Sequence, residues 1–119
     1  MQAVDHVQRA LRLTPLHPHR YFYDSLAATA CISAGLYDQA LEHAQRSLRA
    51  NRKHTSTLRA VAVSQWQLGM HAQARNTAQE LMKLEPTLTI GRWLERAPSA
   101  PYRLGQEVAN VFRKLGVPD

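Results

Sequence analysis

The chain has 119 residues, of which 45% are hydrophobic and 20% are charged, and its formal net charge is +6. This length suits one domain with its own core and is too short for two ordinary domains. A single cysteine, Cys31, excludes a disulfide framework, and no apolar run reaches the ~18–20 residues that a membrane span needs. The lone cysteine fits a reduced, cytoplasmic setting, so we expect a cytoplasmic protein. The first residues also lack the layout of a secretory signal, and we expect no direct insertion into membranes.

Composition and apolar spacing predict helices along the whole chain. Ala, Leu, Gln and Arg are abundant while Val and Ile are sparse, a balance that favours helix over strand. In chain order the expected helices are 2–13, 19–34, 37–50, 54–68, 71–84, 87–96 and 102–115. Gly35 and Gly69 would each end a helix, because glycine most easily adopts the left-handed backbone found at helix C-termini. Pro98 and Pro101 break the chain before the last helix.

A repeat of 34 residues organises these helices. The segment 33–53 recurs 34 positions later, which aligns Gly35 with Gly69 and Ala44 with Ala78. Such a constant shift is typical of helical-repeat proteins, in which each unit buries its apolar face against its neighbours.

A partial third copy precedes the two full units. Residues 3–15 match residues 74–86 and would form the second helix of a truncated unit, so we expect the chain to be a fragment of a longer protein. The single domain 1–119 therefore divides into 2–18 (second helix of a truncated repeat and linker), 19–52 (repeat 1), 53–86 (repeat 2) and 87–119 (a short helix and a C-terminal capping helix).

Small residues recur where helices should approach one another closely. Ala28, Ala40 and Ala44 would allow this approach, with larger residues filling the space around them. The core-facing side of 19–34 is expected to be Tyr23, Leu26, Ala27, Ala30, Cys31 and Ala34.

The period, the glycine turns, the mid-unit alanines and the closing Pro86 resemble the tetratricopeptide repeat. The resemblance covers roughly residues 3–90 and implies an all-α fold. That fold is a right-handed solenoid of antiparallel helix pairs, here closed by a C-terminal capping helix. The sequence departs from the family pattern where its early Trp would stand, at Asp24 and Leu58.

A closer resemblance extends over residues 8–119. The phrases ALRLTPLHPHRYFY, KLEPTLTIGRWLERAP and FRKLGVPD are similar to the C-terminal tetratricopeptide region of bacterial class III adenylate or guanylate cyclases. Related regions end some bacterial transcriptional regulators. The resemblance implies that any catalytic domain lies upstream, outside this chain.

No catalytic, cofactor or metal site is predicted. The histidines are scattered and lack the converging ligands of a zinc site, and the glycines form no phosphate-binding loop. Asp38 and Glu42 lie in the first turns of a helix, where carboxylates favour the positive end of its dipole. We therefore expect no enzyme and no small-molecule substrate.

The outward side of the first helices is the predicted partner-binding surface, a concave groove. Its residues are Phe22, Thr29, Ser33, Arg59, Val63, Trp66 and Met70. Three covers are open for Trp66: the chain's own C-terminal part through Trp93, Val108 or Phe112, a second copy of the chain, or a peptide from another protein.

The predicted function is a non-catalytic module for protein–protein contact or self-association, within a larger bacterial signalling protein. The alternative is a basic helical module that binds nucleic acid through its arginines, as the net charge of +6 and the sequence pI near 10.1 allow. The arginines are dispersed, with one local cluster at 49–53, so the sequence favours a protein partner.

Overall fold

The computed structural model describes residues 20–97 and 102–119, without the side chains of Arg20 and Phe22. The helices in this part of the chain are α2 (Arg20–Ser33), α3 (Tyr37–Ala50), α4 (Thr55–Gln67), α5 (His71–Leu84), α6 (Ile90–Arg96) and α7 (Arg103–Lys114). No strand occurs in the described ranges, which confirms the all-α prediction. The predicted helix 2–13 and the prolines at 98 and 101 lie outside those ranges.

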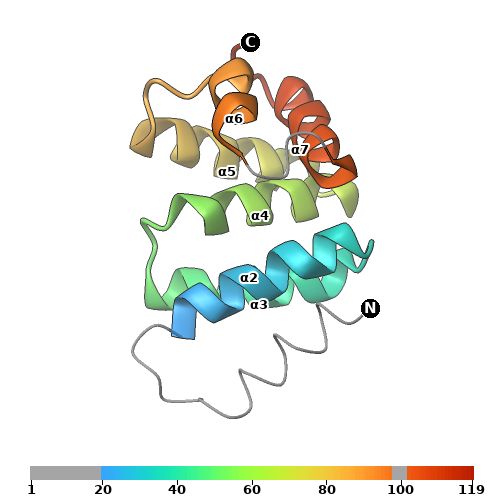
Figure 1. The fold of residues 1–119 in the computed structure, drawn as a ribbon. Coiled ribbons are helices and arrows are strands. Elements are labelled where there is room, and N and C mark those ends of the chain that lie inside the picture. Colours follow the sequence, from blue (N-terminus) through green and yellow to red (C-terminus); the bar gives the residue numbers. More distant parts are fainter. Residues whose placement is uncertain (1–19, 98–101) are drawn as a thin grey trace.

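The helices α2 to α5 form two stacked hairpins. Helix α2 packs against α3, and α4 packs against α5, while α4 also contacts both α2 and α3. Figure 1 shows α4 between the first hairpin and α5. Helix α4 is therefore the central element, and its apolar residues meet neighbours on several sides.

Both hairpin turns have the same backbone structure. Gly35 and Gly69 have φ angles of 77° and 81°, in the left-handed region. Leu36 N–H donates to the Cys31 carbonyl and Met70 N–H donates to the Gln65 carbonyl, each at 2.8 Å. Each bond spans five residues around its glycine, the pattern of a Schellman motif. The predicted helix ends at these glycines are confirmed, and α3 and α5 start and end 34 positions apart.

Alanines occupy the closest helix contacts, as predicted. Ala28, Ala40, Ala44 and Ala74 are fully buried. One expectation about α2 is wrong: Leu26 is 44% exposed instead of buried. The Leu26 side chain lines a groove between α2, α4, α6 and α7, which leaves it open to solvent.

A carboxylate occupies the buried side of α2. The Asp24 side chain is 1% exposed and lies 3.4 Å from His43 Nδ1 of α3 and 4.0 Å from an Arg46 guanidinium nitrogen. Buried carboxylates need partners of this kind, because an isolated charge away from water is costly. This polar group joins α2 to α3 at a position where a bulky ring would otherwise fill space.

Helix α6 begins later than predicted. The predicted start was residue 87, but residues 85–88 form a turn in which Leu88 N–H donates to the Glu85 carbonyl at 3.0 Å. The Thr89 hydroxyl then accepts a hydrogen bond from Arg92 N–H at 3.1 Å. Threonine is a favoured N-cap, so the helix starts after it.

The last helix covers the α2 and α4 side of the stack. Helix α7 packs against α4, α6 and α2. Its Phe112 is fully buried and meets the Trp93 ring of α6 edge-on, with ring centroids 5.7 Å apart. The N–H groups of Ile90 and Gly91 donate to the carbonyls of Pro118 and Asp119 at 2.8 and 3.1 Å. The chain end after α7 therefore folds back onto the start of α6.

Glu107 of α7 also ties this helix to both hairpins. Its carboxylate accepts a hydrogen bond from the Tyr37 hydroxyl at the start of α3 and another, at 3.0 Å, from the Gln67 amide at the end of α4. Burial, this hydrogen bond and the charge of Glu107 raise the pKa of Tyr37 to about 12, while Arg103 opposes the shift.

The Tyr37 pair predicts a loss of stability in alkali. The pKa of Tyr37 is higher in the folded chain than its ordinary value of 10. The contribution of the protonated tyrosine to the free energy of unfolding is therefore complete below pH 10 and is lost as the pH rises towards 12. A difference titration of phenolate absorbance, wild type minus Tyr37→Phe, should show this tyrosine ionising near pH 12. Ionisation near pH 10 in the folded chain would contradict the pair.

No helix in the described ranges is long and apolar enough to cross a membrane.

Candidate functional site

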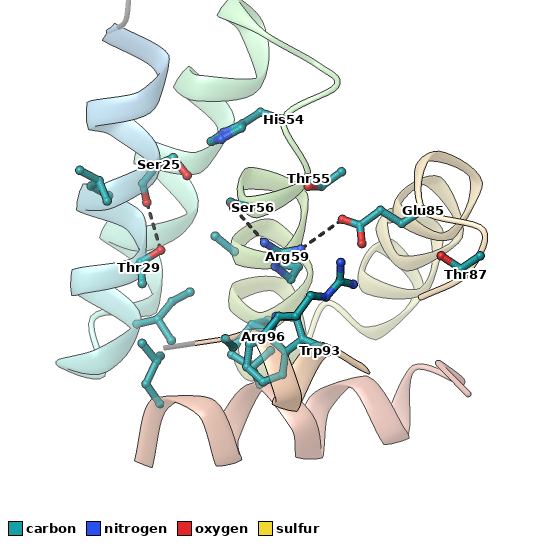
Figure 2. Close-up of a pocket in the computed structure, with 17 residues that line it drawn as sticks. Ser25, Thr29, His54, Thr55, Ser56, Arg59, Glu85, Thr87, Trp93 and Arg96 are labelled. Atoms are coloured by element: carbon teal, nitrogen blue, oxygen red, sulfur yellow. Dashed lines mark hydrogen bonds and ion pairs between the residues drawn. The ribbon is translucent and has the colours of Figure 1, made fainter. Parts of the chain in front are cut away.

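A groove of about 900 Å³ lies between α2, α4, α6 and α7. Helix α2 supplies one wall and α4 the other, while residues of α6 and α7 line the part between them. Figure 2 shows Ser25 and Thr29 on the α2 side facing Ser56 and Arg59 on the α4 side. The groove thus brings the outward sides of two first helices together with the C-terminal part of the chain.

Arg59 is the most buried cation in the groove wall. Its side chain is 22% exposed, and its guanidinium donates to the Glu85 carboxylate at 3.2 Å and to the Ser56 hydroxyl at 2.8 Å. Burial lowers the pKa of Arg59, Glu85 opposes that shift, and the charge of Arg96 adds to it. The guanidinium stays protonated at neutral pH, because an arginine pKa starts far above that range.

Arg96 adds a second cation from another element. This exposed residue ends α6, and Figure 2 shows its side chain reaching towards the Arg59–Glu85 pair. Within the described ranges it makes no ion pair. Two guanidinium groups therefore lie near one carboxylate, which pairs with Arg59 alone, and this leaves an excess of positive charge.

His54 also lines the groove, and a chain of hydroxyl groups holds it in one tautomer. The Ser47 hydroxyl donates its proton to the Tyr21 carbonyl at 2.7 Å. Its 2.9 Å contact with Thr57 then requires the Thr57 hydroxyl to donate. His54 Nδ1, 2.7 Å from that hydroxyl, must therefore carry a proton.

The His54 imidazole is neutral at pH 7. Burial lowers its pKa below the ordinary value of 6.5, and the charge of Arg59 lowers that pKa further. The positive charge of Arg59 therefore acts on a second titratable group in the groove, the His54 imidazole.

Apolar side chains line much of the rest of the groove. They are Leu26 and Ile32 of α2, Trp93 of α6, and Leu104 and Val108 of α7. An exposed leucine in a concave, partly apolar site is a feature of surfaces that bind a ligand or a protein segment.

Only part of the predicted surface lies in this groove. Thr29, Arg59 and Val63 line it, and Val63 is fully buried at its floor. Ser33 lines a separate, smaller pocket of about 100 Å³ beside Tyr37. Met70 precedes α5 and does not line the groove. The Phe22 side chain lies outside the described part of the chain.

Trp66 also lies away from the groove, and its own chain covers it. The His71 ring stacks on the indole with centroids 3.9 Å apart and an interplanar angle of 17°. The guanidinium of Arg75 and the ammonium of Lys114 lie 5.5 and 6.0 Å from the ring centroid. The chain itself therefore covers the Trp66 ring, but through His71, Arg75 and Lys114, none of which the sequence analysis named.

Sequence reasoning missed four residues that shape the groove: Leu26, Glu85, Trp93 and Arg96. Leu26 was assigned to the core, and Trp93 was considered only as a cover for Trp66. The usable signal for Glu85 and Arg96 was that each places a charge at a helix end, Glu85 directly after α5 and Arg96 as the last residue of α6. That signal does not say which wall either side chain meets.

Comparison with protein-family models, with curated proteins and with solved structures finds no match to this chain. Within the ranges that the structure describes, no group of three or more His, Cys, Asp or Glu side chains could hold a metal ion.

Proposed function

We propose that this chain is a non-catalytic protein-interaction module of tetratricopeptide type, and that its groove binds a segment of a partner protein. Two hairpins with identical glycine turns, offset by 34 positions, support the repeat assignment. The right-handed superhelix of that family is part of the proposal.

The groove itself carries the functional part of the proposal. A volume of about 900 Å³ lies at the upper end of the range of ligand sites, roughly 300–1,000 Å³, and far exceeds a packing defect. It offers an apolar wall with the exposed Leu26 and a polar end with Arg59. Such a combination suits a peptide segment, whose side chains and backbone can use both parts.

The wider setting is proposed from sequence. The phrases shared with the C-terminal regions of bacterial cyclases and of some transcriptional regulators suggest a larger signalling protein of that kind. In such a protein the module would recruit a partner, while the chemistry or DNA binding belongs to other domains.

A charge reversal on the apolar wall tests the groove. Leu26→Glu should abolish capture of partner proteins by the immobilised chain, because a carboxylate would replace apolar contact area at the centre of the wall. Leu84→Glu is the matched control, since Leu84 is 40% exposed, similar to Leu26, and does not line the groove. Circular dichroism should show equal helicity for both variants and the wild type.

Two results would count against this function. Equal capture by the Leu26→Glu variant and the wild type would exclude the groove as the contact. The second is binding of a DNA or RNA oligonucleotide that weakens steeply between two salt concentrations, which would favour the basic module that binds nucleic acid.

A further inference from the structure

The charged end of the groove points to the chemistry of the partner. We propose that the groove takes a protein segment in which an Asp or Glu side chain stands next to a large apolar side chain. The carboxylate would bind between Arg59 and Arg96, and the apolar side chain would lie on the wall that contains Leu26. This inference deepens the proposed function and rests on it.

The first argument is the local charge balance. Arg59 and Arg96 supply two positive charges, and Glu85 supplies one negative charge. The Arg59 side chain is mostly removed from water, so its charge is weakly screened. A second carboxylate at this place would neutralise the excess and satisfy Arg96, which has no ion pair in the described ranges. Guanidinium groups suit this role because their donors match the two oxygens of a carboxylate.

The second argument is the position of the apolar wall. Leu26, Leu104 and Val108 line the same groove as the two arginines, and Leu26 is 44% exposed. A bound carboxylate therefore has apolar surface within the same groove. A segment that combines the two kinds of side chain can satisfy both parts at once.

The overall charge decides against a second copy of the chain as the occupant. Two copies, each with a net charge of +6, repel one another, and an acidic partner is attracted. Nucleic acid fits the groove less well, since a phosphate backbone needs a track of cations. Here a carboxylate, Glu85, stands beside the cations, and most of the other lining residues are apolar or carry only hydroxyl groups.

A selection experiment tests the proposed chemistry without a known partner. The purified chain would be used to select binders from a phage library of random peptides. We expect the recovered peptides to carry Asp or Glu beside Leu, Ile, Phe or Trp. The strongest peptide would then be synthesised with a fluorophore, together with a version in which Asn or Gln replaces its acidic residue.

Binding measured by fluorescence anisotropy then locates the carboxylate. Arg96→Gln should weaken the acidic peptide about tenfold, as should the amide substitution in the peptide. Combining both changes should weaken binding little more than either change alone, because both remove the same contact. Arg52→Gln is the control: Arg52 is an exposed arginine, paired with Glu80 away from the groove, and its loss should change affinity less than twofold.

The possible outcomes distinguish failure of the acidic-segment inference from failure of the proposed peptide-binding function. Selected peptides that lose binding with Leu26→Glu, but lack acidic residues or ignore Arg96→Gln, would overturn the inference and leave the groove as a peptide site. If no selected peptide is sensitive to Leu26→Glu, both proposals fail. A dimer that Leu26→Glu dissociates, or an oligonucleotide whose binding depends on Arg96, would also overturn the acidic-peptide assignment.

Discussion

Replacing Phe112 with alanine should lower the free energy of unfolding by about 3–5 kcal/mol. The Phe112 side chain is fully buried, and its ring meets Trp93 edge-on, so the truncation would leave a cavity at the contact between α6 and α7. Chemical denaturation followed by circular dichroism measures the loss. In a Trp66→Phe background Trp93 is the remaining tryptophan, and its fluorescence reports on the same contact.

Tyr102→Ala is the control for this prediction. Tyr102 precedes the same helix and is 69% exposed, so its removal should change stability by less than about 0.5 kcal/mol. A Phe112→Ala variant as stable as the control would mean that α7 does not pack on the stack as described.

The second large effect is expected at the centre of α4. Leu58→Ala should cost about 2–5 kcal/mol, because Leu58 is fully buried in the helix that contacts α2, α3, α5 and α7. Unfolding should remain a single cooperative transition, because α4 belongs to the second hairpin and also packs against the first. Denaturation curves from circular dichroism and from tryptophan fluorescence should therefore coincide.

A partly exposed leucine provides the comparison. Leu84, at the end of α5, is 40% exposed, and Leu84→Ala should cost less than about 1 kcal/mol. Two separate transitions in the Leu58→Ala variant would contradict the central role of α4.

The helices of the two hairpins could be predicted from the sequence because their signals are local. Gly35 and Gly69 end helices through their own left-handed backbone, and the constant shift of 34 positions transfers the boundaries of one unit to the other. The alanines at the interfaces, such as Ala44 and Ala78, could be recognised for the same reason. The start of α6 was missed because Thr89 competes with Pro86 and Thr87 as a starting point, and only the capping hydrogen bond decides between them.

The groove depends on contacts that the sequence pattern does not encode. Tyr37 and Glu107 stand 70 positions apart, and their contact helps to place α7 along the outward side of the first helices. Arg59, Val63 and Trp66 share helical spacing in α4, yet the structure puts the first two in the groove and the third against α5. The two ends of this helix face contact different neighbouring helices. Helical spacing in the sequence does not show which neighbour each residue contacts.

The return of the chain end to α6 has a consequence for the order of folding. Helix α6 has seven residues, well below the ~12–15 at which an isolated helix becomes even marginally stable in water. Its first N–H groups, at Ile90 and Gly91, are held by carbonyls that follow α7, so the intervening chain forms a loop closed at Pro118 and Asp119. Helices α6 and α7 should therefore acquire protection from amide hydrogen exchange together, as one cooperative unit that assembles on the hairpins.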